Sequence, residues 1–297
     1  MAGLRGEDPL AAVLRVGVLG LGRMGSAVAE RLAGRFEVAT FDPAVAGTAT
    51  SVAEVAATSD VLLTVLPGAR EARQALLHQG GLAALRPGAL WLDLTSNDPA
   101  VVDELVDAAA ASGVVSAAAP MAGGPAEARN GDLRFFVAGP PGVRDLVATV
   151  LDPLGRPFEP VVGDRPAHAH LVKLLANGLW FGQALAVTEA LLVAGANGVG
   201  AETARVILAQ SAGGSVFLDR HAPLLISGDD MTDFSLDRVV DELDALERAA
   251  GTVPGPVRQI VADVHRAALA EFGPVNGELL GARLIERRAN RRVGESP

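Results

Sequence analysis

The chain has 297 residues, a formal net charge of −10 at pH 7 and no cysteine. The acidic balance argues against a nucleic-acid partner, and the absence of cysteine excludes disulfides, thiolate metal ligands and a cysteine nucleophile. The sequence contains no run of eighteen purely apolar residues that would predict a membrane span, and residues 1–12 lack the basic start of a signal peptide, so we expect a cytoplasmic protein.

Apolar runs typical of β-strands alternate with helical patterns through the first half of the chain. The helical patterns include Arg23–Ala33 and Pro99–Ser112. Strands that alternate with helices predict an α/β fold with a mostly parallel sheet covered on both faces. The expected strands are Val13–Leu19, Phe36–Phe41, Val61–Leu66, Leu90–Leu94, Val114–Ala118, Phe135–Ala138 and Phe158–Val162.

From Pro166 onward the pattern is almost entirely helical, beginning with a long helix over Pro166–Ala196. A chain of 297 residues favours two domains. We therefore place a first domain at 1–165 and an all-helical second domain at 166–297. We expect the charged tail Arg287–Pro297 to be frayed. The further expected helices are Ala201–Ser211, Leu236–Ala250, Pro256–Glu271 and Gly277–Ala289.

A glycine-rich turn follows the first apolar run and opens the first helix. Gly20, Gly22 and Gly25 form the pattern G-x-G-x-x-G. Glycines in this context permit a tight turn and a close backbone approach, and the helix N-terminus then meets a pyrophosphate. A glycine turn without a ligand is the alternative. The predicted cofactor-binding residues are Gly20, Leu21, Gly22, Arg23, Met24 and Gly25.

Asp42 ends the second expected strand, where an acidic residue selects between nicotinamide cofactors. Its carboxylate would accept hydrogen bonds from the adenosine ribose hydroxyls and repel a 2′-phosphate, which favours NAD over NADP. Arg23 in the glycine segment leaves NADP open, and a plain turn aspartate is the alternative reading of Asp42. Leu66 and Pro67, at the end of the third strand, are expected to border the cofactor or simply to end the strand.

Lys173 is the only lysine among the 25 basic residues. Arginine keeps its proton at any ordinary pH, whereas a desolvated lysine donates or accepts one near neutrality. Asn177 lies at i+4 and therefore shares a helical face with Lys173. The two residues are a candidate general acid/base and an orienting amide, with a surviving surface lysine and a packing asparagine as the alternatives.

Four segments, in this order along the chain, resemble the β-hydroxyacid dehydrogenase family, the group of 3-hydroxyisobutyrate dehydrogenase, tartronate semialdehyde reductase and relatives of 6-phosphogluconate dehydrogenase. They are similar to the family's cofactor loop, its strand-end motif beside the nicotinamide, its substrate loop and its catalytic helix. The resemblance covers nearly the whole chain. The segments are Gly20–Gly25, Asp93–Pro99, Ala119–Pro125 and Lys173–Asn177.

The resemblance implies a Rossmann-type domain, then a helical domain led by a long interdomain helix, with the active site in the cleft between the domains. It implies hydride transfer between NAD or NADP and the hydroxyl-bearing carbon of a 3-hydroxyacid or its semialdehyde. Lys173 would protonate the carbonyl oxygen during reduction or take the hydroxyl proton during oxidation, and Asn177 would orient the substrate.

The resemblance also implies the residues that contact this small-molecule substrate. Gly123 and Gly124 would present backbone N–H groups to a substrate carboxylate. Thr95 would hydrogen-bond the substrate or the nicotinamide ribose, while ordinary helix N-capping is the alternative role of this segment, above all for Ser96 or Asn97. The remaining predicted substrate contacts are Ala122, Phe217 and Asp241.

Three places depart from the family's pattern. Ala122 stands where a serine is usual, and residues 166–170 replace a stretch that is usually glycine-rich. Asp241-Glu242 stands where the family carries a second lysine followed by an aspartate. All three changes touch substrate recognition, so a larger, less anionic or partly cationic substrate is an alternative to a small hydroxyacid.

Two other functions stay open at the level of sequence. An imine reductase shares this architecture but usually replaces the catalytic lysine by Asp or Tyr; Asp241 and the missing serine favour it, and Lys173 opposes it. A non-catalytic cofactor-binding scaffold is the second alternative, which the retained lysine also opposes.

The helices of the second half predict self-association. Ala184–Ala196 and Val257–Ala270 carry more apolar surface than one small domain readily buries, so we expect a homodimer or a homotetramer. Acidic pairs such as Asp241-Glu242 are interpreted as solvated faces, and no metal site is predicted. Of the five histidines, His170 and His221 are the ones expected to border a pocket.

Overall fold

The computed structural model describes residues 14–295, and the chain divides into two compact units after Lys173. The division falls inside the long helix, whereas the sequence suggested a boundary after residue 165. The interpretation of residues 1–12 as something other than a signal peptide concerns residues outside the described range.

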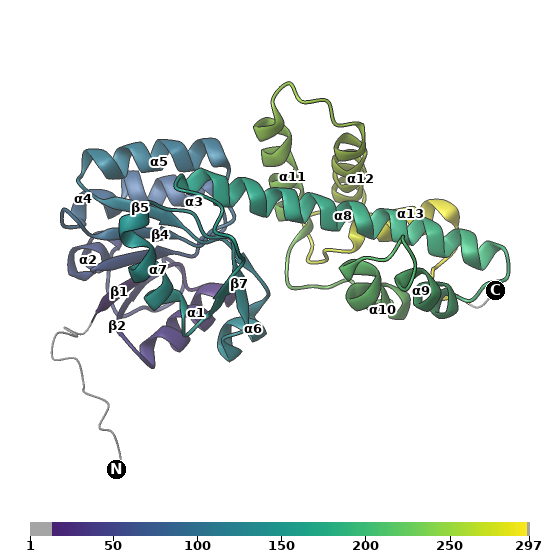
Figure 1. The fold of residues 1–297 in the computed structure, drawn as a ribbon, viewed down its shortest axis with the longest axis horizontal. Helices are drawn as coiled ribbons and strands as arrows, with labels where there is room; N and C mark the ends of the chain where they lie inside the picture. Colours follow the sequence, from purple (N-terminus) through teal and green to yellow (C-terminus); the bar gives the residue numbers. More distant parts are fainter. Residues whose placement is uncertain (1–13, 296–297) are drawn as a thin grey trace, which may run out of the picture. The chain divides into compact units, whose positions relative to one another are not determined.

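The first unit is built on a five-stranded sheet with the strand order β2-β1-β3-β4-β5 (Figure 1). All neighbouring strands are parallel. Every residue of β3 and β4 is buried, as expected of central strands covered on both faces. The strands are β1 (Arg15–Leu19), β2 (Glu37–Phe41), β3 (Val61–Thr64), β4 (Leu90–Asp93) and β5 (Val115–Ala118). The predicted α/β fold is confirmed.

In the described part of the first unit, five α-helices (α1 to α5) connect these strands, two more (α6 and α7) follow β5, and together they cover both faces of the sheet. They are α1 (Arg23–Ala33), α2 (Val52–Thr58), α3 (Ala69–Arg73), α4 (Gly81–Ala84), α5 (Pro99–Ala111), α6 (Pro125–Asn130) and α7 (Arg144–Leu151). One apolar core lies between the sheet and α1, α6 and α7. A second core lies between the other face and α2, α3 and α5. This two-faced burial explains why the sequence shows continuous apolar runs rather than alternation.

A small second sheet corrects two of the predicted strands. It consists of β6 (Met121–Ala122), β7 (Leu133–Phe135) and β8 (Gly155–Pro157), in the order β6-β7-β8. The predicted strand Phe135–Ala138 overlaps β7 only at Phe135, and the predicted strand Phe158–Val162 is wrong, because the strand lies just before it. Pro160 interrupts that apolar run, and a proline has no N–H to donate to a ladder.

The second unit is helical, as predicted. After the long helix α8 (Pro166–Ala196) it contains α9 (Ala201–Ala209), α10 (Ala222–Ser227), α11 (Leu236–Ala250), α12 (Pro256–Phe272) and α13 (Leu280–Ala289). Phe181 of α8 packs in one core with Leu243 of α11 and Ala262 of α12. A π-helical turn, Phe217–His221, leads into α10, and the sequence analysis predicted neither of these two elements.

The charged tail is packed as far as the described residues extend. Val293 is buried, and its backbone N–H donates to Glu286 Oε1 at 2.8 Å. The Arg291 guanidinium donates to the carbonyl of Gly195 at 2.8 Å. The expectation of a frayed tail is therefore wrong for residues 287–295, because one buried apolar side chain and two hydrogen bonds, one of them to α8, hold the segment after α13.

Among residues 14–295, α8 is the one helix long and apolar enough to cross a membrane. Its most apolar window has a mean hydropathy of 1.4, and 33% of that window is buried. Length and composition alone are weak support for a span, since the core helix of a soluble protein meets the same test. Moreover, α8 carries Lys173, Asn177 and Glu189, polar groups that are costly in a bilayer.

Candidate active site

The strands of the first unit end together, and this places their following loops at one edge. Leu19 pairs with both Phe41 and Thr64, Thr64 pairs with Asp93, and Asp93 pairs with Ala118. These are the last residues of the five strands. In an open parallel sheet, ligands bind at this carboxyl edge, where the strand order reverses, which here is between β1 and β3.

The three glycines of the first loop have three distinct geometric roles. Gly20 has φ +97, and a Cβ there would lie 2.3 Å from the carbonyl oxygen of Val65. A Cβ on Gly25 would lie 2.0 Å from the carbonyl oxygen of Gly20. Gly22 differs, since a Cβ there would meet no described atom within 4 Å. The first and third glycines therefore allow a tight turn and close packing, and the second leaves open backbone that a pyrophosphate can approach.

The start of α1 suits a negatively charged ligand. Gly22 is the N-cap residue, and the first turn contains no acidic side chain. The positive end of the helix dipole therefore faces the open side of Gly22 without a competing carboxylate. Leu66 lies against this loop, because its Cδ2 would be 3.1 Å from a Cβ on Gly20, whereas Pro67 is exposed. These features fit a dinucleotide.

Asp42 is held in place by the backbone. Its Oδ2 accepts a hydrogen bond from the N–H of Leu21 at 2.8 Å, and its Oδ1 accepts from Ala44 at 2.8 Å and Val45 at 3.1 Å. Burial raises the pKa of Asp42, but these three donors outweigh burial and hold the pKa below its usual value. A carboxylate offers about four acceptor positions, so one remains on Oδ2 for a ribose hydroxyl. Asp42 is thus both a turn residue and a candidate ribose acceptor.

A buried polar network joins the ends of β3 and β4. Asp93 is fully buried; its Oδ1 accepts from the Thr64 hydroxyl at 2.8 Å and from the N–H of Thr95 at 3.0 Å, and its Oδ2 accepts from Asn97 Nδ2 at 3.2 Å. The Thr95 hydroxyl accepts from the N–H of Leu66 at 3.1 Å and donates to the carbonyl of Thr64. The hydroxyl of Thr95 therefore links the backbone at the end of β3 to the segment after β4. Only part of its hydrogen-bonding capacity is left for a ligand.

The helix cap in this segment is neither Ser96 nor Asn97. Asp98 caps α5, since its side chain accepts from the N–H of Ala100, and Pro99 follows at the first helical position. Asn97 is buried on Asp93 instead. The network of Asp93, Thr64 and Asn97 was not predicted as part of the site, although the alternation of polar residues after a fully apolar strand was visible in the sequence.

Lys173 and Asn177 both lie on α8, one turn apart, and both are half-buried. Asn177 Nδ2 donates to Glu242 Oε2 at 2.5 Å. Glu242, on α11, is only 8% exposed. The bond fixes the orientation of the amide, because an acceptor-only carboxylate must face the NH₂ group. The amide oxygen of Asn177 is thereby turned away from Glu242.

Asp241, a predicted substrate contact, has a mostly exposed side chain. Its side chain is 67% exposed and forms an ion pair with Arg238 at 3.3 Å. Glu242 is the acidic residue that α11 turns inward, so the reading of both residues as a solvated face holds for Asp241 and is wrong for Glu242. Neighbouring residues on a helix are about 100° apart, and only one of the two can follow the buried stripe of Val239, Leu243 and Leu246.

The predicted substrate loop is only partly available for an anion. The backbone N–H of Gly124 donates to Glu127 Oε2 at 2.8 Å, in the capping arrangement of α6. Gly123 has φ +114, so its turn favours glycine. A substrate carboxylate at Gly124 would compete with the Glu127 carboxylate for the same donor. Gly123 and the half-buried Ala122 therefore remain as the backbone contacts of this loop.

Phe217 is a core residue of the second unit. It is 0% exposed and packs edge-on against Trp180 with 5.1 Å between ring centroids. The ring lies at the start of the π-helical turn and has no exposed surface, which is not the placement that a substrate contact requires. Val216, the preceding residue, is 63% exposed. His221 belongs to the same cluster, where its Nδ1 accepts from Trp180 Nε1 at 3.3 Å.

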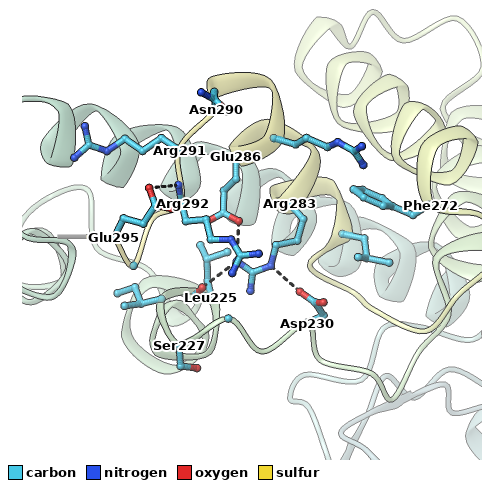
Figure 2. A pocket seen from close by; sticks show the side chains of 15 residues that line it. Leu225, Ser227, Asp230, Phe272, Arg283, Glu286, Asn290, Arg291, Arg292 and Glu295 are labelled. Atoms are coloured by element: carbon cyan, nitrogen blue, oxygen red, sulfur yellow. Dashed lines mark hydrogen bonds and ion pairs between the residues drawn. The ribbon is translucent and has the colours of Figure 1, made fainter. Parts of the chain in front are cut away.

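A large hollow in the second unit contains none of the predicted site residues. It has a volume of about 880 Å³ and is lined mainly by the end of α10, by α13 and by the segment after α13. Figure 2 shows Arg283 between Asp230 and Glu286, at 2.6 Å and 2.9 Å. Arg283 also donates to the carbonyls of Leu225 and Asp229. Because these bonds satisfy the guanidinium within the protein, Arg283 is a structural residue.

Comparison with known families agrees with this geometry. Residues 15–163 match the family described as the NAD binding domain of 6-phosphogluconate dehydrogenase. Residues 167–280 match the family described as NAD-binding of NADP-dependent 3-hydroxyisobutyrate dehydrogenase. The chain is therefore an NAD(P)-dependent oxidoreductase. More particularly, it belongs to the β-hydroxyacid dehydrogenase family, as the four segments implied.

Individual relatives extend over most of the chain. The 2-(hydroxymethyl)glutarate dehydrogenase of Eubacterium barkeri is 29% identical over 272 residues, which cover 86% of this chain and 90% of the relative. A structure of 3-hydroxyisobutyrate dehydrogenase from Mycobacterium tuberculosis, with L-serine, has a TM-score of 0.82 at 22% identity and covers 92% of this chain and 99% of that one. An imine reductase from Streptomyces aurantiacus has a TM-score of 0.58 at 19% identity, with 91% and 99% covered. The two structures show the shared fold.

Proposed function

We propose that the protein transfers a hydride between a nicotinamide dinucleotide and a 3-hydroxyacid or its semialdehyde, with Lys173 as the general acid/base. When bound, the dinucleotide supplies or receives the hydride. Lys173 Nζ gives a proton to the carbonyl oxygen in reduction and takes it from the hydroxyl in oxidation. Asn177, whose amide is oriented by Glu242, helps to position the substrate.

The observation that carries this proposal is the placement of the chain's single lysine. Lys173 follows His170 by one helical turn, and His170 Nε2 lies 3.5 Å from Asp93 Oδ2 at the carboxyl edge of the sheet. The same edge holds Gly22 and Asp42, which suit the pyrophosphate and ribose of a dinucleotide. A proton donor near that edge is what reduction of a carbonyl requires beyond the cofactor.

NAD is the cofactor that we propose over NADP. The backbone donors around Asp42 keep its carboxylate ionised, and an anion at the ribose 2′-position repels a 2′-phosphate. Arg23, the first residue of α1, is exposed, and it is the residue through which NADP would be tolerated.

The substrate that we propose is less anionic than a simple dicarboxylate. Gly124 already donates to Glu127, and Ala122 offers no hydroxyl. Each of these features reduces the number of cationic or donor groups that a substrate carboxylate would find. Turnover of monocarboxylate hydroxyacids above dicarboxylates is the expected preference.

A substrate and cofactor screen tests the proposed function. Hydroxyacids of different size and charge are assayed for oxidation, and the matching semialdehydes for reduction, with NAD and NADP in parallel. The proposal predicts hydroxyacid turnover that is fastest with NAD and that Lys173→Arg strongly reduces. Turnover of cyclic imines with NADPH, in the absence of any hydroxyacid activity, would instead assign the protein as an imine reductase.

The imine reductase remains the second candidate because of one particular contact. Glu242 places a buried carboxylate next to Asn177, and a carboxylate favours a cationic iminium substrate over an anionic hydroxyacid. Lys173 opposes this assignment, since a protonated lysine repels an iminium ion. The screen above separates the two activities directly.

We propose that the protein acts in the cytoplasm as a homodimer or homotetramer that associates through its helical unit. Val257 and Ile260 on α12 are 71% and 62% exposed, and Val193 on α8 is 62% exposed. Exposed apolar side chains on regular helices are typical of surfaces that another chain covers. Sedimentation should show a dimer or larger species that the double substitution Val257→Glu, Ile260→Glu weakens; a wild-type monomer would contradict the proposal.

A further inference from the structure

His170 is a fully buried imidazole with an unusual lack of hydrogen bonds. It is 0% exposed, and within residues 14–295 neither Nδ1 nor Nε2 has a hydrogen bond of ordinary geometry. Buried polar side-chain groups in folded proteins nearly always have a partner. An unsatisfied ring at this depth costs stability, so its presence calls for a function that a leucine at the same position would not provide.

The imidazole of His170 faces the carboxylate of Asp93. His170 Nε2 lies 3.5 Å from Asp93 Oδ2. That carboxylate is fixed by Thr64, by the backbone of Thr95 and by Asn97. A carboxylate only accepts hydrogen bonds, so the nitrogen that faces it must carry the proton. A shift of a few tenths of an ångström would convert the contact into a short N–H···O bond.

The charge state of the ring suits a positioning role. Burial lowers the pKa of His170. The charge of Asp93 opposes that effect, as does a contact with the backbone of Thr95 that falls outside ordinary hydrogen-bond geometry. The net direction is downward, so the imidazole is neutral at neutral pH. A neutral ring orients its neighbours without placing a second positive charge one turn from Lys173.

The contact joins two elements that the proposed reaction needs together. Asp93 is the last residue of β4, two residues before Thr95, and His170 is three residues before Lys173 on α8. Residues three apart on a helix are neighbours on its surface. The pair therefore ties the turn that precedes the lysine to the carboxyl edge of the sheet.

We propose that His170 is a positioning residue whose Nε2–H, donated to Asp93, fixes the first turns of α8 so that Lys173 is held at the carboxyl edge of β4. The role of the lysine in this statement rests on the proposed function above, whereas the His170–Asp93 pair does not. A misplacement of about 1 Å in a proton donor costs about 100-fold in rate, so a brace of this kind has a measurable effect.

The kinetic test compares three variants. His170→Phe keeps the bulk of the ring and removes its N–H; it should lower kcat about 10- to 100-fold and leave KM for the cofactor within about twofold. His170→Gln restores a donor with similar reach and should recover most of kcat. His168→Gln, on the exposed side of the same turn, is the matched control and should behave as wild type. Full activity of His170→Phe, or equal losses in His170→Phe and His170→Gln, would overturn the proposal.

A spectroscopic test is independent of turnover. In protein labelled with ¹⁵N in the histidine rings, only the ring nitrogens of the five histidines are observed. The signals that disappear in His170→Gln are those of His170. The proposal predicts a neutral ring with its proton on Nε2 through the neutral pH range, and a changed Nε2–H signal in Asp93→Asn. A proton on Nδ1, or a signal indifferent to Asp93→Asn, would overturn the pair. Should Lys173 variants prove active while this signal is as predicted, the proposed function fails and the pair stands.

Discussion

Replacing Lys173 by methionine is expected to lower kcat by about 100- to 10,000-fold, the range that a positioned general acid or base contributes. Methionine approximates the length of the side chain and removes only its proton chemistry. The cofactor dissociation constant should change little, because the glycine loop and Asp42 lie on other elements. Steady-state kinetics with the best substrate of the screen, together with a cofactor titration by fluorescence, measure both quantities.

Lys173→Arg is the sharper companion variant. It keeps the positive charge but cannot release a proton at ordinary pH. If the lysine only attracted an anionic substrate, arginine would preserve much of the activity. If the lysine transfers the proton, arginine should be nearly as slow as methionine. Wild-type kcat in either variant would contradict the assigned role.

Asp42→Asn is expected to shift the ratio of kcat/KM for NADP over NAD upward by about 10- to 100-fold, because the repulsion of a 2′-phosphate is removed while the shape is retained. The asparagine oxygen can still accept from Ala44 and Val45. The N–H of Leu21 then faces an amide NH₂ group, so efficiency with NAD should fall as well. Initial rates with both cofactors measure the ratio.

The control for Asp42 is Asp60→Asn, at the opposite end of the sheet. Asp60 accepts from the backbone N–H of Arg15 at 2.9 Å and pairs with Arg86. It loses the same charge without touching the carboxyl edge, so the cofactor ratio should stay at the wild-type value. An unchanged ratio in Asp42→Asn would remove the argument for NAD. Because the pKa of Asp42 is lowered, this carboxylate stays ionised across the neutral pH range and contributes no pH dependence of its own to the wild-type ratio.

Most helices and strands could be predicted from local patterns in the sequence. The helix at Arg23–Ala33 and the long helix at Pro166–Ala196 have the predicted bounds, because glycine or proline lies at or next to their ends. The strand near Pro160 was misplaced. The N–H groups of Phe158 and Val162 still donate to the carbonyls of Phe135 and Val137, but Pro160 between them has no N–H, so the regular ladder does not continue there. The π-helical turn before α10 has no simple sequence signature.

The parts of the site that depend on tertiary packing were harder to predict than those that depend on local sequence. The roles of Gly20 and Gly25 follow from sequence context, and the structure adds the steric reason. Phe217 was predicted as a substrate contact and is buried in a core, and nothing local in the sequence distinguishes an aromatic side chain that lines a pocket from one in a core. Glu242 was interpreted as part of a solvated face, although its spacing to Val239 and Leu246 places it on the apolar stripe of α11. A carboxylate on such a stripe is a signal of a buried partner.

The contact between His170 and Asp93 illustrates the same limit. The two residues are far apart in the sequence, and the partner of a buried histidine follows only from the way α8 packs on the sheet. Sequence alone marked His170 as a residue near a pocket and Asp93 as the start of a motif. Their juxtaposition requires the three-dimensional structure.

The presence of a single lysine allows a direct test of the central claim that Lys173 meets the cofactor. Protein labelled with ¹³C-lysine gives one lysine side-chain signal, which is followed while NAD⁺ is added to saturation. The account predicts that this signal shifts together with the backbone amide of Gly22 and with the same dissociation constant. A lysine signal that stays unchanged while the Gly22 amide responds would contradict it.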